Sequence, residues 1–293
     1  MEWLERLNCA VDYIEEHLTE EIHYDKAAKI ACCSTFHFQR MFSYIAGIPL
    51  SEYIRRRRMT VAAFELQQSD AKVIELALRF GYESPTAFNR AFQSVHGVPP
   101  TAAKETGVRL NAYPRISFHI SIKGDAKMDY RIEKKETFRI VGLKIPLDKD
   151  IEKNFQSVPT FWHEVAQSGN IPKLCSLISG EPNAVLGVSV CMGDEAWEYY
   201  IAGVSDLPIP EDFLGFCEYT VPACTWAVFP GKGTMPDSIQ VLERRIVTEW
   251  LPASGYEYAN APDIEVYLNA DPQNAEYEVW LPITKKRWSG EIS

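Results

Sequence analysis

The stretch FQRMFSYIAGIP, from Phe38 to Pro49, returns later in the chain as FNRAFQSVHGVP, from Phe88 to Pro99. Both stretches follow the pattern F-x-R-x-F-x4-G-x-P, and each matching residue is displaced by 88 − 38 = 50 positions. A match at five fixed positions without a gap is not expected by chance. The chain therefore contains one structural unit twice.

Each copy has the sequence features of a helix-turn-helix. Ser34 and Ser84 stand where a side-chain oxygen can accept a hydrogen bond from the first turn of a helix. Gly47 and Gly97 stand where a left-handed residue ends that helix, and a proline two residues later prevents its continuation. A short apolar helix precedes each serine, so the pattern predicts two helix-turn-helix units.

Residues 50–68 lie between the two units and are predicted to form one helix. Nineteen residues at about 1.5 Å each span roughly 28 Å. Successive major grooves on one side of DNA are about 34 Å apart. The two units could therefore enter two successive grooves without dimerisation.

The charge of the chain is distributed unevenly. The net charge of the 293 residues is −10. Residues 26–110 hold 12 basic and 6 acidic residues, a net of +6, whereas residues 1–25 hold 1 basic and 8 acidic residues. Residues 111–293 hold 17 basic and 26 acidic residues, a net of −9. A basic block between acidic segments is compatible with DNA binding, because only the block needs to meet phosphate.

Polar side chains on the outer faces of the second helices are candidates for base contacts, since Arg can chelate guanine and Asn or Gln can chelate adenine. The candidates are Thr35, Phe36, Gln39 and Arg40 in the first unit and Thr86, Asn89 and Arg90 in the second. An arginine recurs at the same outward position in both copies, which favours a role in binding over a merely solvated surface. Phe36 suits either contact with a thymine methyl group or a partly buried position at the start of its helix.

Four consecutive arginines, Arg55–Arg58, stand near the start of the spacer helix. Consecutive residues cover all sides of a helix, so at most two of them can face one phosphate strand. We assign Arg55 and Arg58 to phosphate contact. At least one arginine of the four is expected to pair with the acidic first helix instead.

The chain beyond about residue 110 is rich in β-strand patterns. Residues 128–147 alternate apolar and polar side chains and predict a strand or a hairpin, and residues 159–169 predict a helix with Pro159 near its start. Two strands follow, and a similar order recurs with a helix over residues 236–251. The pattern indicates an α+β domain of two β-α-β-β repeats with pseudo-two-fold symmetry. We predict a multi-domain chain: an all-α domain with two helix-turn-helix units at 1–107, a linker at 108–127 and the α+β domain at 128–293.

The sequence shows no catalytic, metal or cofactor motif. The seven cysteines form no C-x-x-C pair, and the six histidines have no metal-ligand spacing. The first residues lack the order of a signal peptide, and no apolar run approaches the roughly 20 residues that span a bilayer. We therefore expect a cytoplasmic protein with no cofactor, no metal and no membrane partner.

The helix-turn-helix part resembles the DNA-binding domain of AraC/XylS-type transcription regulators over about residues 5–107. The junction YIRRRRM, the turn GYES and the ending GVPP carry this resemblance. It implies seven helices, double-stranded DNA as a partner, RNA polymerase as a further partner, and base contacts by the outer residues named above. The chain departs from the family pattern at Cys33, where an aromatic residue is usual, and at Pro85, where a hydrogen-bond donor is common.

The second half resembles the GyrI-like effector-binding domain over about residues 128–284, through the segments FRIVGL, EWLPASGYE, PDIEVYLN and VWLPI. The order of the two domains narrows the resemblance to Rob-like regulators. It implies a cleft in which aromatic side chains and one buried glutamate, here Glu265, bind amphipathic and often cationic compounds. Glu265 and Tyr267 share one face of their predicted strand, and a carboxylate among aromatic rings suits an organic cation.

Four further aromatic residues are candidates for the walls of this cleft, although each also suits a hydrophobic core. They are Trp162, Tyr199, Trp226 and Trp280. The hypothesis for the whole chain is a sequence-specific DNA-binding transcription regulator, not an enzyme, that senses a small molecule through its C-terminal domain. The alternatives are that the C-terminal domain is a hydrolase or a protein-interaction module.

Overall fold

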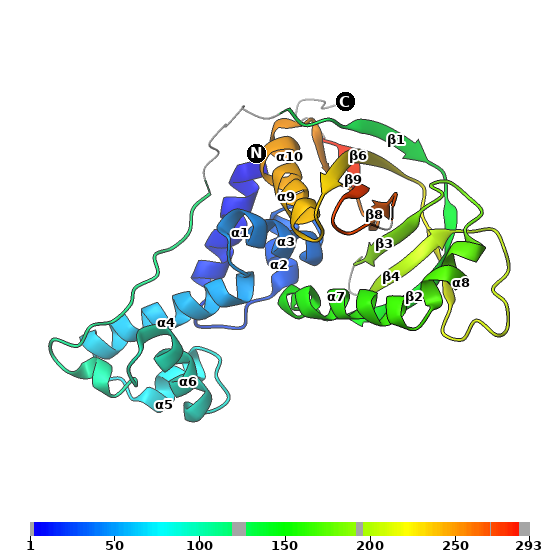
Figure 1. Cartoon of the computed structure of the whole chain (residues 1–293). Helices are drawn as coiled ribbons and strands as arrows, with labels where there is room; N and C mark the ends of the chain where they lie inside the picture. The colour runs from blue at the N-terminus through cyan, green and yellow to red at the C-terminus, as the bar shows by residue number, and fades with distance from the viewer. Residues whose placement is uncertain (1–2, 119–126, 192–195, 270, 287–293) are drawn as a thin grey trace. The chain divides into compact units, whose positions relative to one another are not determined.

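The computed structural model describes residues 3–118, 127–191, 196–269 and 271–286 (Figure 1). Contacts between residues divide the chain into two units, residues 1–120 and 121–293. Among the described residues, no helix is both long and apolar enough to cross a membrane.

The first unit is helical, as predicted. Its described part contains six α-helices and one short 3₁₀ turn, which are α1 Trp3–Glu16, α2 Tyr24–Ile30, α3 Thr35–Ala46, α4 Leu50–Gln68, α5 Val73–Arg79, α6 Pro85–His96 and η1 Ala102–Lys104. The predicted spacer is the 19-residue helix α4, which joins the α1–α3 group to the α5–α6 group in Figure 1. The prediction of two helix-turn-helix units on one continuous spacer helix is therefore confirmed.

Matching residues form the ends of the two recognition helices, α3 and α6. The Ser34 hydroxyl accepts a hydrogen bond from the backbone of His37, and the Ser84 hydroxyl accepts one from the backbone of Ala87. Gly47 and Gly97 end the helices with φ values of 69° and 76°, in the left-handed region that favours glycine. Both helices therefore have the same length, 12 residues.

Two hydrophobic clusters stabilise this unit, one for each helix-turn-helix. The first contains the buried residues Phe38 and Phe42 of α3, and the second contains Phe88 and Phe92 of α6. Each pair is four residues apart and faces one side of its helix. The outer face of each helix is thus left for contacts outside its own cluster.

We expect His96, at the end of α6, to make the stability of the second helix-turn-helix depend on pH. Its Nε2 lies 3.0 Å from the carbonyl oxygen of Met59, the residue is 5% exposed, and burial lowers its pKa below the usual 6.5. The unfolded chain then binds a proton more readily than the folded chain, so stability is fully present above about pH 6.5 and falls as the pH drops towards the lower folded pKa. Denaturant unfolding at about pH 7.5 and about pH 5.5 should show this loss, and His96→Gln should reduce it. An equal pH dependence in both proteins would contradict the assignment to His96.

The second unit is built on one antiparallel sheet with the strand order β1-β6-β9-β8-β3-β4-β2-β5, and β7 pairs with β9. The strands are β1 Arg131–Lys135, β2 Phe138–Leu147, β3 Val185–Val190, β4 Trp197–Val204, β5 Cys217–Val221, β6 Cys224–Gly233, β7 Tyr256–Tyr258, β8 Asp263–Tyr267 and β9 Ala275–Lys285. The helical segments are α7 Ile151–Gln167, α8 Asn170–Leu177, α9 Asp237–Arg245, the π-helical turn η2 Ile246–Trp250 and α10 Leu251–Ala253. The α+β class is therefore as predicted.

The strand order has a symmetric form. From each edge to the centre the order is β1-β6-β9-β8 and β5-β2-β4-β3, and the two halves meet where Gly187 pairs with Glu265. The dipeptide Glu198-Tyr199 in β4 has a counterpart in Glu276-Tyr277 of β9, which lies 277 − 199 = 78 positions later. The two halves thus share their topology, and the exact repeat of β-α-β-β stays an interpretation.

Two local predictions were wrong in part: strands and a helix form where they were predicted, but without the predicted hairpin and with a different helix start. β1 and β2 do not form a hairpin, because β1 pairs with β6 whereas β2 pairs with β4 and β5. The helix predicted from Pro159 begins at Ile151, where the Asp150 carboxylate accepts a hydrogen bond from the backbone of Glu152. Pro159 lies inside α7 rather than at its start.

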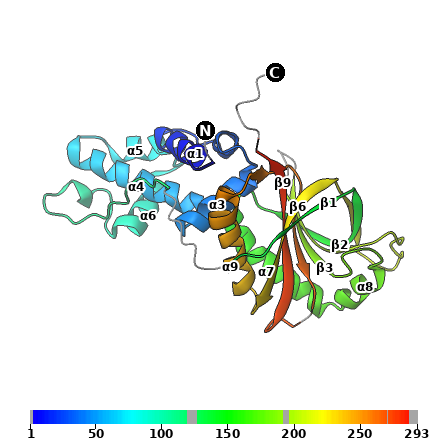
Figure 2. The same ribbon diagram turned by 90° about the horizontal axis from the view of Figure 1, so that it is seen from above.

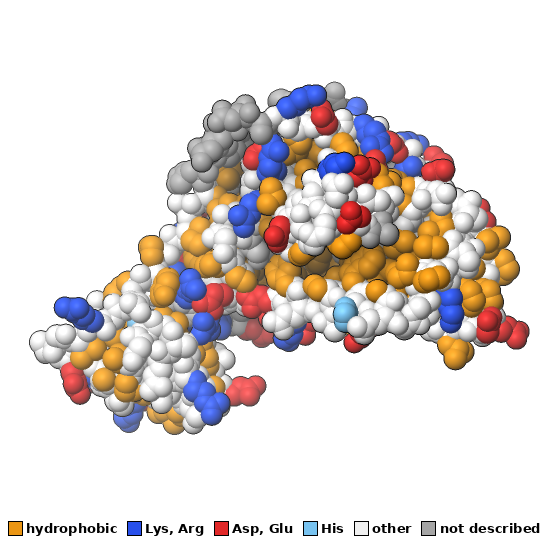
Figure 3. Space-filling model, in the orientation of Figure 1, with side chains coloured by type: hydrophobic (Ala, Val, Ile, Leu, Met, Phe, Trp, Pro, Cys, Tyr) orange, Lys and Arg blue, Asp and Glu red, His pale blue; other side chains and the backbone are white. Residues whose placement is uncertain are grey.

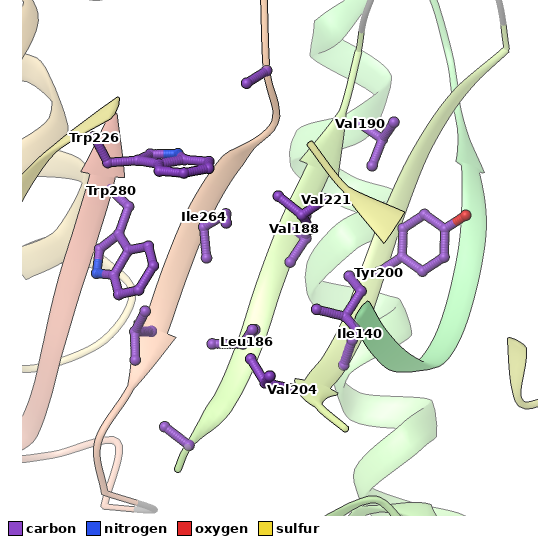
Figure 4. Packing of buried hydrophobic residues seen from close by; sticks show 14 of the residues in the cluster. Ile140, Leu186, Val188, Val190, Tyr200, Val204, Val221, Trp226, Ile264 and Trp280 are labelled. Carbon is purple, nitrogen blue, oxygen red and sulfur yellow. The ribbon is translucent and has the colours of Figure 1, made fainter. Parts of the chain in front are cut away.

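The two faces of the sheet have different surroundings. Tyr267 and Tyr277 are direct neighbours on adjacent strands and lie on one face, where Trp162 of α7 packs against Tyr267. Figure 2 shows α7 and α9 together on this side. Figure 4 shows the other face, where Ile264 of β8 and Val188 of β3 belong to the main hydrophobic cluster. Because successive side chains of a strand point to opposite faces, Glu265 lies with Tyr267 on the face that carries the helices.

Candidate functional site

The second recognition helix, α6, presents its predicted contact residues to solvent. Thr86 and Arg90 are exposed, and Asn89 is half-buried. All three lie off the face that buries Phe88 and Phe92. The structure therefore brings these residues together on the outer side of α6, as the sequence predicts.

The first recognition helix, α3, differs from this pattern. Thr35 and Arg40 are half-buried, whereas Phe36 and Gln39 retain only 7% and 2% exposure. Neither Phe36 nor Gln39 belongs to the cluster around Phe38. Both residues lie off the apolar face, as expected. Neither side chain is exposed to solvent. The burial of Phe36 agrees with the alternative that this residue takes a partly buried position at the start of its helix.

Arg40 is held by aromatic neighbours on its own helix. Its guanidinium carbon lies 5.8 Å from the ring centre of Phe36 and 5.6 Å from that of Tyr44. Its Nε donates a hydrogen bond to the Tyr44 hydroxyl at 3.2 Å. These contacts fix the direction of the Arg40 side chain. A guanidinium held in one direction suits a specific contact with a partner better than a freely moving charge does.

The four arginines of α4 contact three different groups of partners. Arg57 forms a bidentate ion pair with Glu15 of α1, with Nη2 2.8 Å from Oε2 and Nε 2.9 Å from Oε1. The prediction that at least one arginine pairs with the acidic first helix is confirmed. Arg55 and Arg56 both bind the carboxylate of Glu52. Arg58 donates to the carbonyl oxygens of Leu18 and Glu20, each at 2.8 Å.

In the second unit, four of the predicted ligand residues form one hydrogen-bonded cluster. The Trp162 Nε1 donates to the Tyr199 hydroxyl at 2.9 Å, and that hydroxyl donates to Glu265 Oε2 at 3.2 Å. The Tyr267 hydroxyl donates to the same Oε2 at 2.7 Å, and the rings of Trp162 and Tyr267 meet edge to face at 5.0 Å. We name Trp162, Tyr199, Glu265 and Tyr267 the glutamate cluster.

The hydroxyl groups of this cluster stay protonated at neutral pH. Burial, followed by the charge of Glu265, raises the pKa of Tyr199 and that of Tyr267 well above the usual value. Both hydroxyls can therefore donate to the carboxylate throughout the physiological pH range. A carboxylate that accepts two such bonds beside aromatic rings is suited to attract a cation.

The elements that carry most of the glutamate cluster border a hollow in the second unit. Trp162, Glu265 and Tyr267 are only half-buried. Figure 3 shows an apolar hollow between α7 and the segment around β8, the two elements that carry these residues. A separate open groove of about 440 Å³ lies between β2 and α7 and includes none of the four cluster residues.

Gly187 gives the cluster its space, and the sequence did not lead us to it. A Cβ atom at this position would lie 2.2 Å from the Tyr199 hydroxyl and 2.8 Å from Glu265 Oε2. Both distances are shorter than any normal contact, so only glycine fits without displacement of these groups. A glycine inside a strand is the signal that could have indicated this close approach.

Glu243 of α9 is a second acidic residue that sequence reasoning missed. It is 6% exposed and shares the inner face of α9 with Ile239, four residues earlier. Burial is the main cause that raises the pKa of Tyr199, Tyr267 and Tyr277, and the charge of Glu243 is a smaller cause. A glutamate on the apolar stripe of an amphipathic helix is the signal that was available.

Trp226 and Trp280 are not brought to this cluster. Both belong to the hydrophobic cluster on the other face of the sheet, where they lie beside Ile264 in Figure 4. Trp280 donates a hydrogen bond from Nε1 to Glu278, and the Lys135 ammonium lies 4.7 Å from its ring centre. Their position is that of core aromatics, the other role that their sequence allowed.

The fold and these sites together define a two-part protein: a double helix-turn-helix unit and an α+β unit that carries a polar-aromatic cluster. The chain matches the family model of a helix-turn-helix domain over residues 27–106 and that of integron-associated effector binding proteins over residues 131–283. It belongs to the AraC-type helix-turn-helix transcription regulators that carry a GyrI-like effector-binding domain.

Two curated relatives match about a third of this chain. The transcriptional activator AarP of Providencia stuartii is 39% identical over 89 residues, which are 30% of this chain and 66% of AarP. The multiple antibiotic resistance protein MarA of Escherichia coli is 33% identical over 103 residues, which are 35% of this chain and 81% of MarA. A solved structure of a putative transcription regulation protein from Staphylococcus aureus MU50 covers 54% of this chain and 99% of its own, with 21% identity and a TM-score of 0.47.

Proposed function

We propose that this protein binds double-stranded DNA as a monomer, with α3 and α6 in two successive major grooves, and changes its regulatory output when a cationic amphipathic compound occupies the glutamate cluster. The observation that carries the DNA part is the repeated helix-turn-helix on one 19-residue spacer helix. That helix spans roughly 28 Å, which suits two grooves about 34 Å apart.

Base recognition is assigned to the outer faces of α3 and α6. Thr86, Asn89 and Arg90 are the proposed base-contacting residues of α6, in agreement with their position on its outer side. On α3 we propose Thr35 and Arg40, and also Phe36 and Gln39, which are 7% and 2% exposed in this structure and would have to become accessible to reach a base. Arg40 and Arg90 occupy equivalent positions, and arginine on guanine is the commonest specific contact in the major groove.

Phosphate contact is assigned to Arg55 and Arg58 of α4. The Arg55 side chain is 38% exposed, and its partner Glu52 lies on the same helix, so the pair can open at little cost. Arg58 donates to the carbonyl oxygens of Leu18 and Glu20 through Nε and Nη2, so a phosphate contact would use the N–H groups that these two bonds do not occupy. Arg57 is not included, because its guanidinium is committed to Glu15.

Ligand binding is assigned to the glutamate cluster, with Glu243 as a second acidic group in the same unit. Two phenol hydroxyls that converge on Glu265 hold a negative charge beside the aromatic rings of Trp162, Tyr199 and Tyr267. A cation that enters would gain both the charge interaction and contact with the rings. Trp226 and Trp280 are left out of this proposal because they face the other side of the sheet.

The DNA part is tested with duplexes that the full-length protein selects from a random pool. Arg40→Ala and Arg90→Ala should each weaken binding to the selected duplex by about 1–3 kcal/mol and relax the preference at one or two base pairs. Arg244→Ala is the matched control, because it removes one exposed arginine from the second unit. Unchanged affinity and base preference in both variants would exclude α3 and α6 as the recognition helices.

A further inference from the structure

Residues 110–118 form an arm that follows η1 without regular secondary structure and packs on the first unit. Leu110 and Tyr113 pack against the cluster of the second helix-turn-helix, and Ile116 and Phe118 pack against that of the first. The arm therefore crosses from one cluster to the other. It lies within the segment that the sequence predicted to be a linker, whose residues 119–126 fall outside the described residues.

The arm is fixed to α4 through its backbone. Arg57 Nη1 donates to the carbonyl oxygen of Tyr113 at 2.6 Å, and the Tyr113 amide donates to Thr60 Oγ1 at 3.1 Å. The Ile116 amide donates to the Tyr53 hydroxyl at 3.2 Å. Tyr53, Arg57 and Thr60 are spaced by four and three residues, so they form one stripe along the spacer helix.

The two ends of the arm contact the two recognition helices. Near its start, Asn111 Nδ2 donates to the carbonyl oxygen of Val95 in α6 at 2.7 Å. At its end, the Phe118 ring meets the Phe42 ring of α3 edge to face at 5.7 Å. Asn8 of α1 holds the Phe118 backbone with two hydrogen bonds, at 2.8 and 3.0 Å.

A flexible linker needs none of these contacts, since its backbone groups can bond to water. Here one extended segment contacts α3, α4 and α6, the three helices whose arrangement sets the spacing on DNA. We propose that residues 110–118 brace the two helix-turn-helix units, and that Thr60, Asn111 and Phe118 are positioning residues for DNA recognition that do not touch DNA themselves. The proposal rests on the proposed function.

The test uses the duplex that the full-length protein selects from a random pool and the same duplex with one base pair inserted between the half-sites. One inserted pair rotates the second groove by about 35°. The wild type should lose tenfold or more in affinity for the longer duplex. The full-length variant Thr60→Val/Asn111→Ala, which lacks two of the arm contacts, should lose threefold or less.

The control is Ala112→Ser, an exposed position of the same arm, which should behave as the wild type. Hydrogen exchange of the Tyr113 amide should be faster in the double variant, because Thr60→Val removes its acceptor. The brace is contradicted, and the proposed function is not, if wild type and double variant lose affinity for the longer duplex by the same factor. Unchanged hydrogen exchange of the Tyr113 amide would also contradict the brace. Failure of the wild type to select any duplex would contradict the proposed function and the brace with it.

Discussion

Replacing Arg57 by methionine is expected to lower the free energy of unfolding of the first unit by about 3–5 kcal/mol. The guanidinium and the Glu15 carboxylate are both largely buried, at 13% and 8% exposure of their side chains. The hydrogen bond to Glu15 is the main cause that raises the pKa of Arg57. Methionine would leave the Glu15 carboxylate buried without its cation, which costs more than the pair itself contributes.

Two variants make this prediction specific. Arg55→Met removes an arginine that is 38% exposed, pairs with Glu52 on the same helix and donates to the Ser94 hydroxyl of α6. Both contacts are near solvent, so the cost should stay at about 1 kcal/mol. Glu15→Leu/Arg57→Met removes both charges and should recover part of the stability, because no buried charge is left. The recovery stays partial because the Tyr113 carbonyl loses its hydrogen bond from Arg57 and the Tyr53 hydroxyl loses its acceptor Glu15. Urea unfolding followed by hydrogen exchange of α1 and α4 peptides is the measurement. A loss as small as that of Arg55→Met would show that the ion pair is open in solution.

The four arginines also show what the sequence can and cannot determine. Their position on the spacer helix, and the pairing of at least one with the acidic first helix, follow from local periodicity and from charge. Which arginine pairs with Glu15 depends on how α1 crosses α4, 42 residues away in sequence. No local pattern contains that angle, so the partner of Arg57 could not be predicted.

The second unit shows the same division between local and long-range information. Alternation places Glu265 and Tyr267 on one face of β8, and the structure keeps them there. Alternation does not say which face carries the helices, so Trp226 and Trp280 were grouped with Glu265 although they lie on the other side. The role of Gly187 was missed for the same reason, since it depends on Tyr199 and Glu265 in two other strands.

Glu265→Gln is expected to weaken binding of a lipophilic cation such as tetraphenylphosphonium by roughly tenfold to a hundredfold. The substitution keeps the size of the side chain and its capacity to accept hydrogen bonds from Tyr199 and Tyr267. It removes only the charge, and a charge-assisted contact in a partly desolvated site contributes on the order of 1.5–3 kcal/mol. Calorimetric titration of the wild type and the variant measures the difference.

A neutral aromatic ligand of similar size, such as triphenylphosphine oxide, separates charge from packing. Its affinity should not fall in Glu265→Gln, because burial of an uncompensated carboxylate is costly. Gly187→Ala should weaken both ligands alike, since its methyl group would displace the Tyr199 hydroxyl and the Glu265 carboxylate. Glu276→Gln, an exposed carboxylate on β9 that pairs with Lys232, is the matched control and should change neither.

DNA binding gives an independent check on Glu265→Gln. Without ligand, the variant should bind the selected duplex as the wild type does, because Glu265 lies in the second unit and domains usually fold independently. Equal affinity of wild type and Glu265→Gln for the cation would remove Glu265 from the binding site. A wild type that binds anions in preference to cations would contradict the whole assignment, because two phenol hydroxyls that already donate to a carboxylate cannot also stabilise an anion beside it.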